Sequence, residues 1–448
     1  MKYFLKLLLL LNLCFNLPIV VSAKNIEELI LSNGLKIIVK PDHRAPSVVF
    51  QIYYKVGSSD ESEGITGISH LLEHLMYLSD NNLLLGENFN CLNNIGSIGN
   101  AYTTRDFTFY YHIMGKKYLA LAFATESHRM QHLSPSITEF NIEKKVIWEE
   151  LHSVQGKDPF LVAYNKLYEL AFKNNTYQFP VIGRLEDFEN LTLSKTMSWY
   201  KNYYTPDNAT IVVVGDIEAA EVFKLARQYF LPVHKTKVLN NHKADKKTNR
   251  KSAEIRFVMP DNITVGAILL AYKVPSINTS APKWEAYALE LLAGWLETGS
   301  MTRLTRVLIK DKQMANEITI SYSSMSKENT LFIIEAIPKQ GISLKLLEKT
   351  LVDEIKKIKN ELITQDSLQK IKNQMIAVEI FDRDSMYTQA KIIGQAESVG
   401  IHWSDDAQYI SHIKNVTAAQ IRTVLKKYFI AENKIIVIQN SHNTNDKK

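Results

Sequence analysis

Residues 200–216, YKNYYTPDNATIVVVGD, decide how the chain is organised, because residues 425–440, LKKYFIAENKIIVIQN, repeat their pattern. In both stretches a tyrosine is followed five residues later by an asparagine and then by an apolar run that is typical of a β-strand. The matching residues are Tyr203 with Tyr428 and Asn208 with Asn433. A repeat of this length predicts two copies of one domain rather than a solenoid of short units.

A second pair of matching stretches keeps the same order along the chain. YKVGS at residues 54–58 recurs as YKVPS at residues 272–276, each after an apolar run with β character. Between the copies, residues 235–251 are rich in lysine and asparagine and poor in apolar residues, which is typical of a linker. The predicted organisation is a first domain at residues 24–234, a basic linker at 235–252 and a homologous second domain at 253–448.

Strand and helix patterns are mixed within the first copy. Residues 27–40 contain two alternating apolar stretches around an Asn-Gly pair, the strongest short-range signal for a β-hairpin. Residues 64–78 have the apolar spacing of a helix, residues 101–113 have the pattern of a strand, and residues 138–154 that of an acidic helix. Because there is no regular βαβ alternation, we predict an α+β fold in which each homologous domain is an antiparallel-rich sheet with helices on one face.

The N-terminus has the pattern of an export signal. Lys2 and Lys6 precede a long apolar run that closes on small residues, which predicts a signal peptide at residues 1–23 with cleavage after Ala23. An uncleaved membrane anchor is the alternative, because the run is near the lower limit for spanning a bilayer. We expect no further membrane span. The mature chain would keep one cysteine, Cys91, so its stability must come from packing or a metal.

The net charge of +6 and the hydrophobic content of 46% indicate a folded globular protein with an excess of basic residues. Two of these charges lie in the signal peptide, and the linker segment contains seven basic residues against Asp245. The basic residues are therefore concentrated in a solvated linker rather than on a binding face. We expect no nucleic-acid partner.

Residues 67–80, GISHLLEHLMYLSD, place two histidines and a glutamate inside an apolar run. On a helix, His70 and His74 lie one turn apart and can present both imidazoles to one point, with Glu73 beside them. Two neutral imidazoles suit zinc, and an adjacent carboxylate can take a proton from metal-bound water, as in the H-x-x-E-H motif. The alternative is a pair of core or partly exposed histidines with satisfied hydrogen bonds.

A catalytic zinc also needs a third protein ligand and an open coordination position. Glu143 and Glu150 on the acidic helix lie two turns apart and share a face, whereas Glu149 points about 100° away from Glu150. Acidic residues on a helix usually form a solvated face. Here Val146 and Ile147 lie on the same helix, so one carboxylate edge can be partly buried.

The stretches GITGISHLLEHLMYLSD, NAYTTRDFTFYY and EKKVIWEELHSV, in this order, resemble the inverzincin metallopeptidases of family M16, which include pitrilysin, insulin-degrading enzyme and the mitochondrial processing peptidase. The resemblance covers essentially the whole mature chain. It implies that zinc is the cofactor, with His70, His74 and Glu150 as ligands. It also implies that Glu73 is the general base and that Glu143 is a supporting catalytic carboxylate near the site.

The resemblance gives a role to GNAYTTRD as well. In the family this strand lies at a sheet edge beside the zinc and pairs with an extended substrate, so Asn100, Ala101 and Thr103 fall at substrate-binding positions. From the residues alone, an ordinary strand of good β formers is the alternative. The overall length is similar to that of short bacterial members that work as dimers, which implies export across the inner membrane to the bacterial periplasm.

The chain departs from the family pattern in its second domain. The family usually supplies an arginine there and a tyrosine seven residues later, which stabilise the developing oxyanion. Ile309 and Asn316 occupy the corresponding positions, and neither can do that work in the same way. Arg303, Arg306 and Tyr322 lie nearby in the sequence.

The intact zinc motif in the first domain, combined with the missing arginine and tyrosine in the second, leads to two alternative functions. The first is a secreted zinc endopeptidase that cuts peptides or unfolded protein segments as half of a heterodimer with a related M16-like subunit, or as a homodimer. The alternative is a weakly active or inactive subunit of the same fold that binds peptides or supports assembly.

Overall fold

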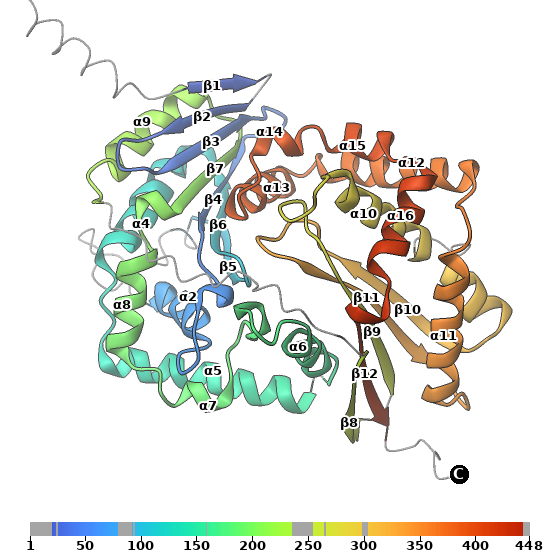
Figure 1. The fold of residues 1–448 in the computed structure, drawn as a ribbon. Helices are drawn as coiled ribbons and strands as arrows, with labels where there is room; N and C mark the ends of the chain where they lie inside the picture. The colour runs from blue at the N-terminus through green and yellow to red at the C-terminus, as the bar shows by residue number, and fades with distance from the viewer. Residues whose placement is uncertain are drawn as a thin grey trace, which may run out of the picture. The chain divides into compact units, whose positions relative to one another are not determined.

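The computed structural model (Figure 1) describes residues 20–23, 26–78, 92, 95–157, 159–234, 254–263, 266–297 and 303–441. It divides into two compact units, each assembled from three segments of the chain. Unit 1 contains Met1–Ile147, Val181–Asn241 and Arg383–Ser398, and unit 2 contains Trp148–Pro180, His242–Asp382 and Val399–Lys448. The predicted linker at residues 235–252 and Cys91 lie outside the described residues. The predicted domain boundaries therefore stay predictions.

Unit 1 is built on a seven-stranded sheet with the order β1-β2-β3-β7-β4-β6-β5. All neighbouring strands are antiparallel except β3 and β7, which are parallel. The strands are β1 (Val20–Ala23), β2 (Ile26–Ile30), β3 (Lys36–Pro41), β4 (Ser47–Tyr54), β5 (Ile98–Thr103), β6 (Thr108–Gly115) and β7 (Ala209–Gly215). β1 lies inside the predicted signal peptide, so cleavage after Ala23 would leave β2 as the outer strand.

Local sequence signals account for most of these strands, with two corrections. The predicted hairpin is confirmed by the pairing of β2 with β3, and Gly34 in its turn has a φ of 95°. The predicted single strand at residues 101–113 is wrong, because Thr104 Oγ1 accepts hydrogen bonds from the N–H groups of Asp106 and Phe107 and turns the chain. The helix predicted from residue 64 begins only at Ile68, since Gly67 has a φ of 88°.

Unit 2 repeats this sheet with five strands in the order β10-β11-β9-β12-β8. Its one parallel pair, β12 with β8, matches β7 with β3, and its other pairs are antiparallel. The strands are β8 (Ile255–Ile263), β9 (Ala267–Val274), β10 (Ala315–Tyr322), β11 (Thr330–Pro338) and β12 (Lys434–Ser441). The Asn208 side chain donates to the Tyr203 carbonyl at 2.9 Å, and Asn433 donates to the Tyr428 carbonyl at 3.0 Å. These equivalent contacts confirm the predicted duplication.

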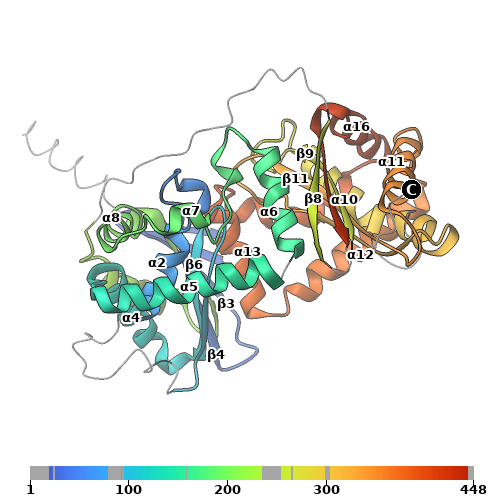
Figure 2. The same ribbon diagram turned by 90° about the horizontal axis from the view of Figure 1, so that it is seen from below.

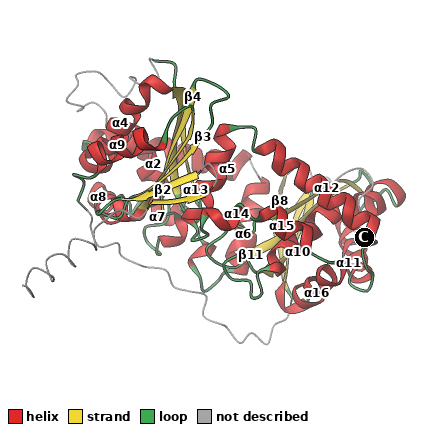
Figure 3. Cartoon of the chain, turned by 90° about the horizontal axis from the view of Figure 1, so that it is seen from above, coloured by secondary structure: helices red, strands yellow, loops and turns green. Residues whose placement is uncertain are grey.

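Helices cover both faces of the sheet in unit 1 (Figure 3). Phe50 of β4 packs against Phe123 of α4, with ring centroids 5.0 Å apart, whereas the next residue, Gln51, points to the opposite face and donates to the Tyr387 carbonyl of α13. The helices are α2 (Ile68–Leu78), α4 (Leu119–His132), α7 (Leu185–Phe188), α8 (Leu193–Tyr203), α9 (Ala219–Phe230) and α13 (Met386–Ser398), with short helices η2 (Ser58–Asp60), η4 (Lys116–Tyr118) and η6 (Pro206–Asn208). The division between the units falls within the continuous helix α5 (Ile137–Lys157).

The sheet of unit 2 is covered in the same way (Figure 2). Leu167 of α6 belongs to a buried apolar cluster with Leu269 of β9, while Tyr272 faces the other side and stacks on Phe429 beyond α16. The helices are α6 (Pro159–Ala171), α10 (Trp284–Glu297), α11 (Leu344–Ile358), α12 (Gln365–Asp382), α14 (Trp403–Asp406), α15 (Tyr409–Asn415) and α16 (Ala418–Tyr428), with short helices η5 (Thr176–Gln178), η7 (Thr305–Asp311, a π-helix) and η8 (Ala431–Asn433). Among the helices of the described residues, none has the length and apolar character needed to cross a membrane.

The two copies exchange helices. α6 comes from the first half of the sequence but packs on the sheet of unit 2, and α13 comes from the second half but packs on β4 and β7 of unit 1. The predicted helices on one face of each sheet are therefore those that come from the same copy as the sheet. The opposite face of each sheet is covered by a helix from the other copy.

Candidate metal centre

Buried acidic groups fix the start of α2. Glu61 is 1% exposed, and its carboxyl oxygens accept hydrogen bonds from the N–H groups of Gly67 at 2.7 Å and Ser69 at 2.9 Å. Asp187 holds the preceding loop through the N–H of Gly64 and the hydroxyl of Thr66. Side-chain oxygen acceptors are favourable at a helix N-terminus because the first N–H groups have no partner within the helix. The backbone that presents the histidine motif is therefore set from its first turn.

The two histidines of α2 lie side by side. The ring centroids of His70 and His74 are 4.8 Å apart with the ring planes at 80°. Burial, with a smaller contribution from His74, lowers the pKa of His70 to about 4, so this imidazole is neutral at physiological pH. Its Nδ1 is buried and has no hydrogen-bond partner among the described residues.

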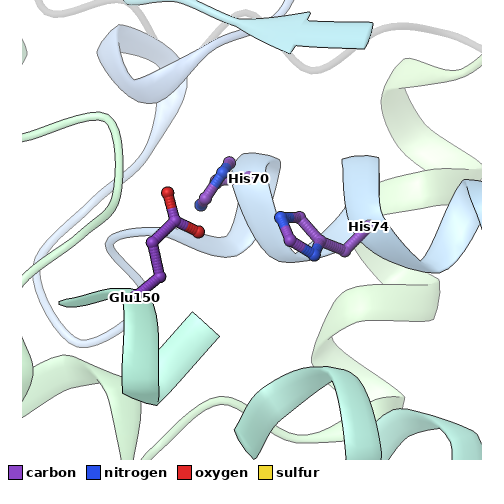
Figure 4. Close-up of side chains that lie close together, drawn as sticks. All are labelled: His70, His74 and Glu150. Carbon is purple, nitrogen blue, oxygen red and sulfur yellow. The ribbon is translucent and has the colours of Figure 1, made fainter. Parts of the chain in front are cut away.

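Helix α5 brings two carboxylates to these rings. Glu143 Oε2 lies 2.9 Å from Nδ1 of His74, which joins α5 to α2 within unit 1. Because α5 is continuous, the same helix carries Glu150 two turns further on. One side-chain ligand atom from each of His70, His74 and Glu150 lies within 4.8 Å of the others (Figure 4). Glu150 is exposed, and so is Glu149, the neighbour that the helical spacing turned away.

The donor set fits zinc. Two imidazoles and one carboxylate are a known ligand set of catalytic zinc sites. An imidazole that is half-buried and neutral and whose Nδ1 has no hydrogen-bond partner among the described residues, as in His70, suits a ligand better than a core histidine. Glu143 engages one ring nitrogen of His74, which leaves the other nitrogen for a metal and fixes the ring orientation. The structure thus brings the three predicted ligands and Glu143 together.

Glu73 is 9% exposed, and its Oε2 accepts a hydrogen bond from the hydroxyl of Thr103 at 2.5 Å. Thr103 ends β5, which is an edge strand of the sheet in unit 1. Of the other two predicted substrate residues, Ala101 is buried and Asn100 is exposed, with its Oδ1 accepting the Ala101 N–H at 2.9 Å. The sequence did not show the contact between Thr103 and Glu73, since it depends on how the strand lies against the helix.

Sequence reasoning also missed Glu61 and Asp187. A signal for Glu61 existed, because an acidic residue shortly before an apolar helical run is typical of a helix start. Asp187 had no such signal, since it follows the motif by more than a hundred residues and reaches it through tertiary structure.

In unit 2, Ile309 lies on the π-helix η7 and Asn316 is an exposed residue of the edge strand β10. The nearby alternatives already have partners. Arg303 donates to Glu361 at 2.9 Å, and the Tyr322 hydroxyl donates to the Pro275 carbonyl at 2.7 Å. These hydrogen bonds hold both side chains within unit 2. The assignment of Ile309 and Asn316 to the arginine and tyrosine positions of the family stays a prediction.

Two family models match the chain. Residues 36–184 match the model described as Insulinase (Peptidase family M16), and residues 190–375 match the Peptidase M16 inactive domain. The zinc protease PqqE of Helicobacter pylori is 28% identical over 344 residues, which cover 76% of each chain. An uncharacterized zinc protease of Rickettsia bellii is 24% identical over 406 residues, covering 89% of this chain and 94% of that one.

Solved structures have the same fold. A protease from Helicobacter pylori matches with a TM-score of 0.85 and 25% identity, over 95% of this chain and 100% of that one. The periplasmic protease PqqL of Escherichia coli matches with a TM-score of 0.78 and 16% identity, over 94% of this chain but 48% of that one.

Proposed function

We propose, from the premise that the chain belongs to peptidase family M16, that it is an exported zinc endopeptidase which cuts peptides or unfolded protein segments. The observation that carries this proposal is the convergence of His70, His74 and Glu150 beside the buried carboxylate Glu73. A subunit that only bound peptides would gain nothing from a general base next to an open metal site. The periplasm is the proposed location, by likeness to the periplasmic protease PqqL.

The chain's own residues divide the chemical work. Zinc, when bound, would supply Lewis-acid activation of water and of the substrate carbonyl. The Glu73 carboxylate would take the proton from the attacking water and pass it to the leaving amine. Glu143 would keep the His74 ring oriented, and Glu61 would keep the first turn of α2 in place.

The free edge of β5 supports binding of an extended substrate. Among the strands of the described residues β5 pairs with β6 alone, so its other side offers backbone N–H and C=O groups to a further strand. Asn100 and Ala101 lie in this strand, which the hydrogen bond from Thr103 places beside Glu73. Recognition through the main chain fits peptides and unfolded segments better than folded proteins.

The chain would work with a related subunit. Ile309 and Asn316 supply no positive charge or phenol for an oxyanion, so a partner that carries the arginine and tyrosine would complete the site. The fold of this chain matches about half of PqqL, and it covers 92% of the separately solved first half of that protein. A homodimer is the second form of this proposal.

The alternative is an inactive peptide-binding subunit, which is favoured by Ile309 and Asn316 in place of the arginine and tyrosine. The deciding experiment is a peptide-cleavage assay on the zinc-loaded chain alone and mixed with a related M16 chain that has the arginine and tyrosine. We expect weak activity alone and a large rise on mixing. Full activity of the lone chain that survives dilution would remove the need for any partner. Bound zinc without cleavage in any mixture would favour the inactive subunit.

A further inference from the structure

The side chains of β5 point alternately to the two faces of the sheet. Tyr102 faces α13, and its ring centroid lies 5.5 Å from that of Phe109, the residue opposite it on β6. Thr103 points the other way, to α2, where its hydroxyl donates to Oε2 of Glu73 at 2.5 Å. A threonine hydroxyl has one proton to donate. That proton is directed to Glu73 and so is not offered to a peptide carbonyl.

The backbone around Thr103 is held firmly. The turn after it is closed by the N–H of Thr104, which donates to the Phe107 carbonyl at 2.8 Å. The N–H groups of Ser58 and Ser59 donate to the carbonyls of Thr104 and Arg105 at 3.1 and 2.9 Å. This close approach needs a glycine at the preceding position, since a Cβ on Gly57 would lie 2.3 Å from the Thr104 oxygen.

The same short segment also holds the helix that carries Glu73. Residues 57–59 contact the β5–β6 turn. Glu61 lies two residues further along the chain and accepts hydrogen bonds from the N–H groups of Gly67 and Ser69. Strand and helix are therefore anchored to one piece of chain. The contact between the Thr103 hydroxyl and the Glu73 carboxylate is set by this scaffold and is not a chance meeting of two flexible side chains.

We propose that Thr103 is a positioning residue for Glu73 and not a substrate contact. Its hydroxyl holds Oε2, so that the carboxylate keeps one orientation for proton transfer. This inference rests on the proposed peptidase function and revises the role that the family resemblance gives to Thr103.

Kinetics test the proposal with Thr103→Val, which removes the hydroxyl at nearly constant shape, and Thr103→Ser, which restores it. In the zinc-loaded protein we expect Thr103→Val to lower kcat about 10- to 100-fold with KM unchanged, and Thr103→Ser to recover most of that loss. Thr210→Val is the matched control, because the Thr210 hydroxyl is buried without a hydrogen-bond partner among the described residues. A rise in KM at constant kcat would overturn the proposal in favour of substrate contact.

A second measurement needs no activity. A double-mutant cycle combines Thr103→Val with Glu73→Ala and measures urea unfolding of the metal-free protein. We expect Thr103→Val to destabilise the wild-type chain and to have little effect in the Glu73→Ala chain. Additive effects would overturn the proposal. If the wild-type chain cleaves no peptide, either alone or mixed with a related M16 chain, the proposed function fails, and the cycle still decides whether Thr103 holds Glu73.

Discussion

α2 and α10 occupy equivalent places in the two copies, the first between β4 and β5 and the second between β9 and β10. α2 places His70 and His74 within reach of each other and of α5, and it also carries Glu73. α10 instead buries Ala288, Leu291 and Leu292, and its buried Glu285 accepts hydrogen bonds from Lys427 and Tyr428 near the end of α16. One copy places a candidate metal centre on this helix, and the other uses it to hold the domain together.

This difference between α2 and α10 teaches that the duplicated fold does not require the polar residues of the metal motif on this helix. Both helices bury apolar residues against their units, and Leu71, Leu72 and Leu75 of α2 are fully buried like the leucines of α10. Burial of polar groups has a cost unless they are paired or bind a metal. The polar residues of α2 are therefore best explained by chemistry, and those of α10 by packing.

The largest effect should come from the metal ligands. His70→Ala and Glu150→Gln should each reduce zinc from one per chain to near zero, with loss of cleavage, because three protein ligands are needed. The measurement is metal analysis of the purified protein. His128→Ala is the control, since His128 and His132 also have ring centroids 4.8 Å apart but no third ligand among the described residues. Stoichiometric zinc in either ligand variant would disprove the assignment.

Glu73→Gln should separate metal binding from catalysis. The amide cannot accept the proton, so cleavage should fall about 10²- to 10⁴-fold while zinc content stays at one per chain. Steady-state kinetics with metal analysis of the same sample checks this. Unchanged turnover, with contaminating proteases excluded, would remove Glu73 from the mechanism.

The equivalent change in α10 should affect stability alone. Glu285→Gln weakens the hydrogen bonds from Lys427 and Tyr428, and we expect a loss of about 1–3 kcal/mol in the free energy of unfolding. Zinc content should not change. Chemical unfolding and metal analysis test both statements, and loss of zinc here would contradict the division of roles between the two helices.

A last effect concerns the pH dependence of stability. Burial raises the pKa of Glu61 from 4.5 to about 8. Between these values the folded chain keeps a proton that the unfolded chain has lost, so this contribution to stability is complete below pH 4.5 and is lost as the pH rises to about 8. Glu61→Gln should remove this slope. Urea unfolding of the metal-free chain from pH 5 to pH 8 tests it, and parallel curves for the two proteins would contradict it.

The sequence was most informative where the signal is local. The histidine spacing, the acidic helix and the β2–β3 hairpin all follow from periodicity or turn chemistry within a few residues. The contacts of Thr103 with Glu73 and of Asp187 with Thr66 join segments that only the folded chain brings together. The turn at Thr104 was missed because the residues just before it and those from Phe107 onward are good β formers, although its hydroxyl can close a turn.

The exchange of α6 and α13 has a consequence for how the protein can be made. All seven strands of the sheet in unit 1 have been synthesised once β7 is made, yet the face that α13 covers lacks this helix until residue 398 has been synthesised. Gly394 of that helix lies so close to Tyr53 that a Cβ would come within 2.0 Å of its ring, so no bulkier segment can replace it. The unit that is synthesised first is therefore completed late, and a chain shortened at the linker would expose an apolar sheet face to aggregation.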